Sequence, residues 1–282
     1  MPQDDTATIV AAAIGQAGRE DRSSPARRRA KKVFIARVLF FIGLAGAWQS
    51  LSLWPYFGPN LTPGLQRIIP EIIRLAGTPM LWGAMWDTLS YALLALLLGA
   101  ITGITLGTAV GLIRPVRRSS RLLLEVLRAT PLFGLMPIFI LLLGTGPVFK
   151  LSLPFLGSMW PFLVQTSQGV AKVDSVLIET VRSFRVPKRH VLLRVVLPNA
   201  LPYMATALRL SLVLSILITV GVEALMKLPG LGAEVALSSQ YAAMTEMWAW
   251  IFYAAVVGMG ATLLVERVEK AMIYWRPSGR SA

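Results

Sequence analysis

Charged residues divide this chain into long segments that carry almost no charge. A membrane-spanning helix needs about 20 consecutive, mostly apolar residues. Six segments meet this length, and only the fifth contains a charge, Arg209: 38–54, 88–113, 129–149, 151–171, 195–222 and 247–265. None alternates polar and apolar residues as a membrane β-strand does. The pattern predicts an all-α, polytopic membrane protein with six transmembrane helices.

The composition agrees with the hydrophobic pattern. Apolar residues make up 55% of the 282 residues and charged residues only 15%, against roughly 25% in soluble domains. The mean hydropathy is +0.63. These values exclude a soluble enzyme and a disordered chain. The chain has no cysteine and one histidine, His190, so we expect no metal site and no bound cofactor.

Lysine and arginine predict the orientation, because cytoplasmic loops are enriched in them. With the N-terminus inside, inner segments hold 22 of these residues and outer loops hold 4. The net charge of +14 then mainly reflects this bias, and it would also attract anionic lipid. We expect both termini in the cytoplasm, a chain that crosses the membrane several times, and no nucleic-acid partner.

The predicted organisation is a membrane domain between two short tails. Residues 1–32 are expected to be a disordered, basic cytoplasmic tail, 33–275 the transmembrane domain, and 276–282 a second cytoplasmic tail. The first apolar run could imitate a signal peptide, but it continues through Trp54, which favours an uncleaved span. The outer loop at 55–85 is expected to contain a short amphipathic helix, kinked or started by Pro70.

The second span carries four glycines at four-residue spacing: Gly99, Gly103, Gly107 and Gly111. Residues at this spacing share one helix face, and glycine lets another backbone approach closely. We expect helix packing within the subunit, with a dimer seam or the wall of a transport path as alternatives.

Residues 172–198, between the fourth and fifth spans, are too many for a simple turn. Apolar residues at helical spacing lie on both sides of Pro187, which disfavours helix in the residue before it: Val176, Leu177, Val181 and Phe184, then Val191, Leu192, Val195 and Val196. Basic residues rim the bend. The pattern predicts a cytoplasmic helix–turn–helix and leaves open a hairpin resting on lipid headgroups.

Two motifs in this loop carry a family resemblance. The sequence ETVRSF at 179–184, followed by LPNALP at 197–202, resembles the EAA loop of binding-protein-dependent ABC importer permeases. The order of LRATP at 127–131, MPI at 136–138, GTG at 144–146, ALRL at 207–210, Glu223 and GLG at 230–232 is similar to the nitrate/sulfonate/taurine branch. Thr180 and Val181 stand where the loop usually has two alanines, and Arg185 where it has glycine. Arg185 therefore predicts a different bend, eased by Pro187.

The resemblance implies a type I importer fold, a place in the cytoplasmic (inner) membrane of a bacterial cell, and a set of partners. These are two cytoplasmic ATP-binding subunits, a second copy of the permease and a periplasmic or lipid-anchored substrate-binding protein. The chain has no Gly-Lys dipeptide and hence no P-loop, so we expect no enzymatic activity of its own. The coupling helix would be 176–185, and the coupling residues would be Glu179, Val181, Arg182, Phe184, Arg185, Pro187, Lys188, Leu197 and Pro198.

Arg209 is the membrane residue that most needs a partner. An arginine in mid-membrane costs at least roughly 2.5–3.5 kcal/mol, and no acid lies in the other predicted spans. Arg209 could have a structural role, or it could contact a small anionic substrate such as a sulfonate, taurine or nitrate. Glu223 and Thr166 are further candidates for the path. A secondary transporter or a channel is the alternative function.

Overall fold

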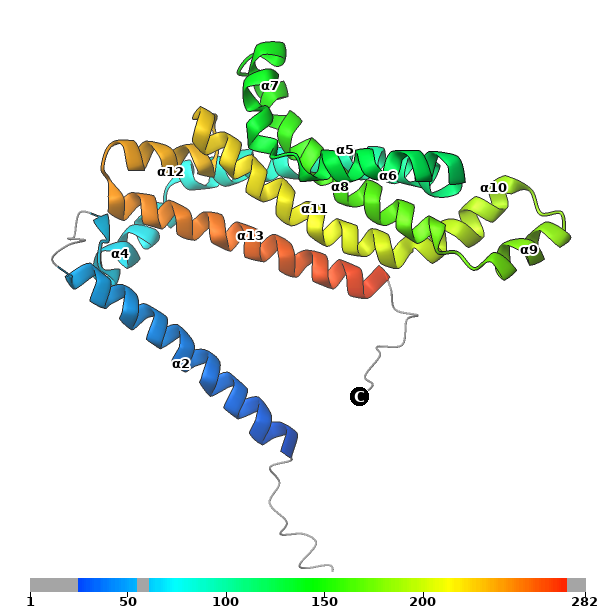
Figure 1. Ribbon diagram of the computed structural model, residues 1–282. Coiled ribbons are helices and arrows are strands. Elements are labelled where there is room, and N and C mark those ends of the chain that lie inside the picture. Colours follow the sequence, from blue (N-terminus) through cyan, green and yellow to red (C-terminus); the bar gives the residue numbers. More distant parts are fainter. Residues whose placement is uncertain (1–24, 55–60, 273–282) are drawn as a thin grey trace, which may run out of the picture. The chain divides into compact units, whose positions relative to one another are not determined.

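The computed structural model describes residues 25–54 and 61–272, and every regular element in these ranges is a helix. The chain forms two compact units, Met1–Leu65 and Gln66–Ala282. The first holds α2 (Pro25–Leu53), and α4 (Leu65–Ala76) starts at its last residue. The second continues with α5 (Pro79–Leu112), α6 (Arg114–Ala129), η1 (Leu132–Leu135), α7 (Met136–Leu143), α8 (Pro147–Ala171), α9 (Ser175–Ser183), α10 (Lys188–Val191), η2 (Leu192–Val196), α11 (Leu197–Met226), α12 (Leu231–Gln240) and α13 (Met244–Met272) (Figure 1).

The first unit is built on α2. This helix begins at Pro25, within the segment expected to be a disordered tail, so residues 25–32 are helical. The rest of that tail, 1–24, and the tail at 276–282 lie outside the described residues. The indole of Trp48 donates a hydrogen bond to the carbonyl of Pro63 at 3.2 Å, and Gln49 accepts one from the amide of Leu65. These bonds tie the end of α2 to the segment that follows it.

Five helical stretches are long and apolar enough to cross a membrane. They are Lys32–Leu53, Pro79–Leu112, Pro147–Ala171, Lys188–Gln240 and Met244–Arg267. Five of the six predicted spans coincide with these stretches, except that Trp54 and Ile113 fall just beyond their ends.

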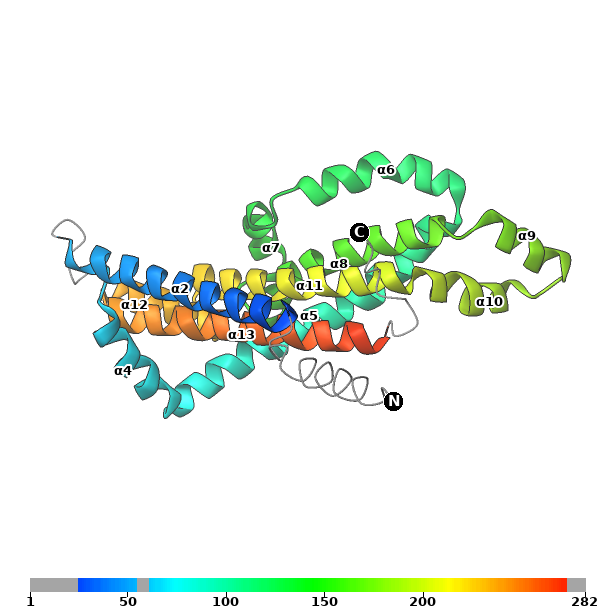
Figure 2. The same cartoon turned by 90° about the horizontal axis from the view of Figure 1, so that it is seen from below.

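The third predicted span is not one straight helix. Of its residues 129–149, Ala129 ends α6, Leu132–Leu143 form η1 and α7, and residues 147–149 already begin α8. A sixth crossing forms here only as a broken span, Leu122–Ala129 with Leu132–Leu143, whose two parts bend by 85°. Pro131 explains the break, because the residue before a proline avoids helical geometry, and Thr130 is extended with ψ at 127°. In Figure 2, α6 stands to one side of α8 and joins α7 at one end.

The four spaced glycines lie where α5 packs against α8. A β-carbon at Gly103 would come within 2.6 Å of the Met159 carbonyl oxygen, and one at Gly107 within 2.5 Å of the Leu163 carbonyl oxygen. Larger side chains at these positions would therefore force the two backbones apart. Glycine supplies the close approach that stabilises helix pairs in lipid.

Serine hydroxyls link α5, α8 and α11. The hydroxyl of Ser158 donates to the Ala95 carbonyl at 2.9 Å, and that of Ser211 donates to the Ser158 carbonyl at 2.6 Å. Ser215 donates to the Ala92 carbonyl at 2.6 Å. All three serines are buried. Such bonds contribute about 0.6 kcal/mol each in membranes, and here they fix three helices to one another.

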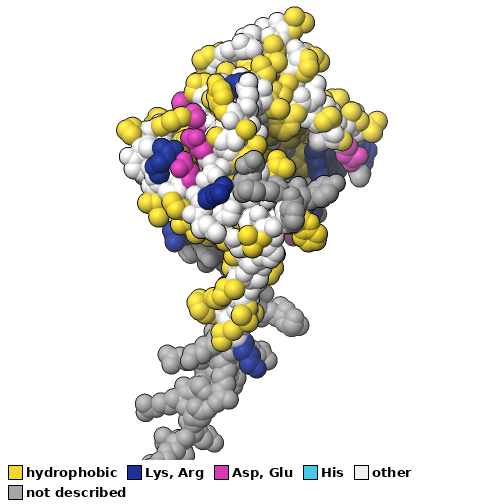
Figure 3. All heavy atoms as spheres, turned by 90° about the vertical axis from the view of Figure 1, so that its left-hand side faces the viewer, with side chains coloured by type: hydrophobic (Ala, Val, Ile, Leu, Met, Phe, Trp, Pro, Cys, Tyr) yellow, Lys and Arg dark blue, Asp and Glu magenta, His cyan; other side chains and the backbone are white. Residues whose placement is uncertain are grey.

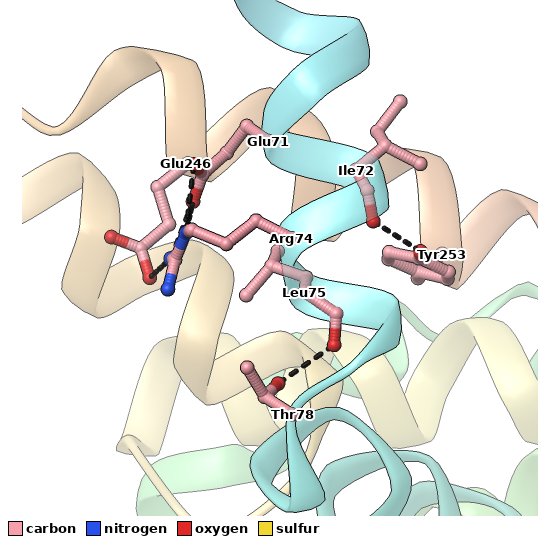
Figure 4. A network of polar contacts seen from close by, with 7 residues as sticks. All are labelled: Glu71, Ile72, Arg74, Leu75, Thr78, Glu246 and Tyr253. Carbon is pink, nitrogen blue, oxygen red and sulfur yellow. Dashed lines mark hydrogen bonds and ion pairs between the residues drawn. The ribbon is translucent and has the colours of Figure 1, made fainter.

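The amphipathic helix predicted in the 55–85 loop is α4, with Pro70 inside it. It is held against α13 by polar contacts (Figure 4). The hydroxyl of Tyr253 donates to the Ile72 carbonyl at 2.6 Å. Arg74 pairs with Glu71 at 2.5 Å and with Glu246 of α13 at 3.7 Å. The hydrogen bond to Glu71 raises the pKa of Arg74.

Figure 3 looks at the end of the molecule that carries α12. Acidic and basic side chains gather there in small areas, surrounded by hydrophobic side chains. Trp250 is fully buried with Leu75, Leu81 and Leu231, so α4, α5, α12 and α13 share one apolar cluster.

Candidate functional site

The predicted coupling loop is a short helix followed by a tight turn. The carboxylate of Asp174 accepts a hydrogen bond from the amide of Val176 at 2.9 Å, which caps the start of α9. At the other end, the amide of Val186 donates to the Val181 carbonyl, and Arg185 has a φ of +51°. This is the Schellman ending, in which glycine usually takes the left-handed position. The expectation of a different bend is therefore wrong: Arg185 adopts the conformation that glycine usually supplies.

The faces of α9 have different surroundings. Ile178 packs against a buried cluster formed by Val170, Val196 and Ala200. Val176 and Phe184 are 66% and 77% exposed. One face therefore attaches α9 to the bundle, and the other presents uncovered apolar side chains.

The remaining predicted coupling residues lie at the surface of the loop or just after it. Val181 and Leu197 are half-buried. Exposed side chains belong to Glu179, Arg185, Pro187, Lys188 and Pro198, whereas the side chain of Arg182 lies outside the described residues. In Figures 1 and 2, α9 and α10 extend beyond the ends of α8 and α11. The loop is therefore accessible from outside the bundle.

The loop continues directly into α11 through a wide helical turn. Residues Leu192–Val196 form a π-helix, in which the amide of Leu197 donates to the Leu192 carbonyl. Pro198 has no N–H to donate and its ring crowds the carbonyl four residues earlier, which accounts for the widened turn. The side-chain amide of Asn199 donates to the Val195 carbonyl at 2.9 Å.

A groove of about 920 Å³ runs along α8 and α11, with the end of α6 and η1 on its other side. Arg209 lines it, together with Trp160, Gln165 and Gln168. A smaller pocket of about 370 Å³ adjoins it, because Arg128, Val164 and Gln168 line both. The described lining of the two pockets contains four basic residues and one acid: Arg117, Arg128, Lys172, Arg209 and Glu125.

Arg209 has an acidic partner that sequence reasoning missed. Its Nη2 atom lies 2.6 Å from Oε2 of Glu269, and the side chains are 47% and 25% exposed. The expectation that Arg209 lacks a carboxylate is therefore wrong. Glu269 follows the sixth predicted span, but α13 continues through Met272 and brings it to α11.

Glu223 lies in a buried polar cluster that joins four segments of the bundle. Its Oε1 atom is 2.9 Å from Nζ of Lys150, and the two side chains are 0% and 4% exposed. The hydroxyl of Thr88 donates to Glu223 at 2.8 Å, and the amide of Gly232 donates at 3.1 Å. Lys150 also donates to the Pro229 carbonyl. We call Thr88, Lys150, Glu223, Pro229 and Gly232 the buried ion-pair cluster.

Glycine is required beside this cluster. Gly230 has a φ of +137°, and a β-carbon there would overlap the Glu223 carboxylate. One at Gly232 would overlap the Val220 carbonyl. The sequence motif GLG at 230–232 thus forms a turn that closes over the ion pair. The sequence showed Lys150 as a single charge between two apolar segments, and it also showed Glu223 and the GLG motif, but it did not indicate that these features meet.

Thr166 lies away from the groove lining. It is fully buried on α8, where a β-carbon at Gly107 would come within 2.9 Å of it. Its hydroxyl has no hydrogen-bond partner in the described part of the chain. Of the three predicted path residues, only Arg209 therefore lines the groove. Among the described residues, no group of three or more histidine, cysteine or acidic side chains could hold a metal ion.

Comparisons with known proteins identify related transport proteins. Residues 95–274, more than half of the chain, match the family described as "Binding-protein-dependent transport system inner membrane component". A protein of Bacillus subtilis (strain 168) named as an aliphatic sulfonates transport permease protein, SsuC, is 28% identical over 260 residues, covering 91% of this chain and 92% of its own length. The taurine transport system permease protein TauC of Escherichia coli (strain K12) is 26% identical over 237 residues, covering 82% and 86%.

A solved structure shares the fold. The MetNI methionine ABC transporter in inward-facing conformations matches with a TM-score of 0.59 and 18% sequence identity. The match covers 70% of this chain and 99% of that one. At this identity the likeness establishes the fold alone.

Proposed function

This chain belongs to the family of binding-protein-dependent transport system inner membrane components, and from that premise we propose that it is the permease subunit of an ATP-driven importer of small sulfonate-type anions. Two copies of the chain form the path, two cytoplasmic ATPases supply the energy, and an external binding protein delivers the substrate. We propose that both termini lie in the cytoplasm, and the excess of lysine and arginine in the segments on that side supports this orientation.

The observation that carries this proposal is the uncovered apolar face of α9. Val176, Leu177 and Phe184 are exposed at the end of the bundle. An amphipathic helix of this kind fits a hydrophobic groove in a partner, and Lys188 and Arg189 beside it suit acidic groups at the rim. We propose that each ATPase binds one α9 and that closure of the ATPase pair moves these helices together. Glu179, Leu197 and Pro198 then transmit movement to α11.

The charge of the groove supports the choice of substrate. Four basic residues line the two adjoining pockets. A cationic lining in a low-dielectric surrounding attracts anions, because screening by water is weak there. The sulfonate group is negatively charged, and two relatives are named for aliphatic sulfonates and for taurine. We propose that the groove forms part of the path and that Arg209 faces the substrate.

Replacement of Phe184 by aspartate tests the docking proposal. We expect Phe184→Asp to lose co-purification with the ATPase, because a central aromatic anchor often contributes 2 kcal/mol or more to an interface, about 30-fold in affinity. Tyr241→Asp is the matched control, because Tyr241 is also 77% exposed but lies at the end of α12. Unchanged ATPase retention and sulfonate uptake by Phe184→Asp would contradict the proposal.

A further inference from the structure

The pair formed by Arg209 and Glu269 stands at the edge of the groove. Arg209 lines it, and α13 reaches it through Thr262. Glu269 follows Thr262 by seven residues, or about two helical turns, so both side chains lie on the same face of α13. The pair therefore places one cation and one anion beside the space that the groove encloses.

Most donors of Arg209 remain uncommitted. A guanidinium has five N–H donors, and in the described part of the chain Arg209 uses one nitrogen, Nη2, for its hydrogen bond to Glu269. Its side chain is 47% exposed. Exposed ion pairs contribute little to stability, so this pair can open without unfolding the bundle.

We propose that Glu269 is the resting counter-ion of Arg209 and that the translocated anion takes its place on the guanidinium. This inference rests on the proposed role of the groove as the path. Without a counter-ion, all the donors of Arg209 would be open to an anion, which would then bind more firmly. A nearby carboxylate weakens that binding, because it competes for the same donors and repels the departing anion.

A single introduced thiol can measure the charge beside the pair, because this chain has no cysteine. We place it by Gln165→Cys on α8, which lines the same groove. In the purified complex with its ATPase, this thiol is labelled with an anionic reagent, methanethiosulfonate ethylsulfonate, and with the cationic ethyltrimethylammonium analogue. The mass of this chain, followed over time, gives the labelling rate for each reagent. The ratio of the rate with the anionic reagent to the rate with the cationic reagent reports the local electrostatic potential.

Glu269→Gln should raise this ratio roughly tenfold, because it removes one negative charge beside the groove. Glu246→Gln is the matched control: it removes the same charge from the first turn of the same helix, 23 residues away and beyond the screening length of about 8 Å. It should leave the ratio unchanged. An unchanged ratio in Glu269→Gln would overturn the proposal.

Uptake provides the second measurement. Proteoliposomes that hold the complex, its ATPase and its binding protein are assayed for ATP-driven uptake of ethanesulfonate per assembled complex. Glu269→Gln should slow uptake roughly fivefold, because tighter binding acts mainly through slower release. Glu269→Asp, which keeps the negative charge, should retain most of the wild-type uptake. Wild-type uptake by Glu269→Gln would overturn the exchange step. Absent uptake in the wild-type complex would instead contradict the proposed function, and the labelling ratio would still decide the role of Glu269.

Discussion

Replacement of Lys150 by methionine is the most informative test of the fold. Lys150→Met keeps most of the length of the side chain but removes the charge, so it leaves the carboxylate of Glu223 buried without its cation. Thr88 and Gly232 still donate hydrogen bonds to that carboxylate, at 2.8 and 3.1 Å. These two bonds offset part of the loss but cannot neutralise a charge.

The expected loss follows from burial. Breaking one partner of a buried pair costs about 3–5 kcal/mol, out of a typical total stability of about 5–15 kcal/mol. For a chain of this size, 1 kcal/mol corresponds to about 2–4 °C, so the unfolding temperature should fall by roughly 6–20 °C. Glu223→Gln should cost less, because Lys150 keeps the Pro229 carbonyl and lies 4.3 Å from the centre of the Tyr91 ring.

The assay is thermal unfolding of the detergent-purified protein at one fixed heating rate, since membrane proteins often unfold irreversibly. Lys227→Met is the control, because Lys227 is an exposed lysine that donates to Gln240. It should change the unfolding temperature by less than about 2 °C. The double variant Lys150→Met with Glu223→Gln removes both charges, so it should lose less than the sum of the two single variants. A small shift for Lys150→Met, or losses that simply add, would refute a coupled buried pair.

Three further predictions concern the loop, the packing and the units. Arg185→Gly should stabilise α9 by up to about 1 kcal/mol, because a left-handed φ of +51° is strained in arginine; hydrogen exchange of the α9 amides measures this, and faster exchange would contradict it. Gly107→Leu should abolish folded protein, as measured by size-exclusion chromatography, because α8 backbone lies within 2.5 Å of an added β-carbon. Gly258→Ala is the control and should behave as the wild type, because nothing lies within 4 Å of a β-carbon there. A chain truncated to residues 66–282 should still co-purify with the ATPase, because the second unit contains α9 and is compact by itself; loss of the ATPase from a folded truncation would count against this.

The sequence was sufficient for the features that depend on local pattern. Charge-free windows located the long apolar helices, and helical spacing located α4 and α9, because burial in lipid and amphipathicity act along one segment at a time. The third span was the exception. Pro131 in the sequence indicates a break in the helix at Thr130, but the absence of charge across the segment favours one continuous span.

Contacts between distant helices were not predictable from one sequence. In the sequence, Lys150 is a charge in a short outer loop and Glu223 is a candidate for the path. Only the packing of α5, α8, α11 and the 227–232 turn brings the two together. The pairing of Arg209 with Glu269 likewise requires knowledge that α13 passes beside α11 and how far it continues. Neither helix carries a local pattern that identifies its neighbour.

The π-helix at Leu192–Val196 holds one residue more in its turn than an α-helix does, because its hydrogen bond reaches back five residues instead of four. Deleting one residue there would let the turn close as ordinary α-helix, so the segment before it would keep nearly the same direction around the axis of α11. Deleting a residue from the α-helical part of α11 would instead turn everything before it by about 100° relative to the bundle. The apolar face of α9 would then point in another direction, although the length and composition of the chain would hardly change. The wide turn is therefore a place where this protein can lose a residue without redirecting its docking helix.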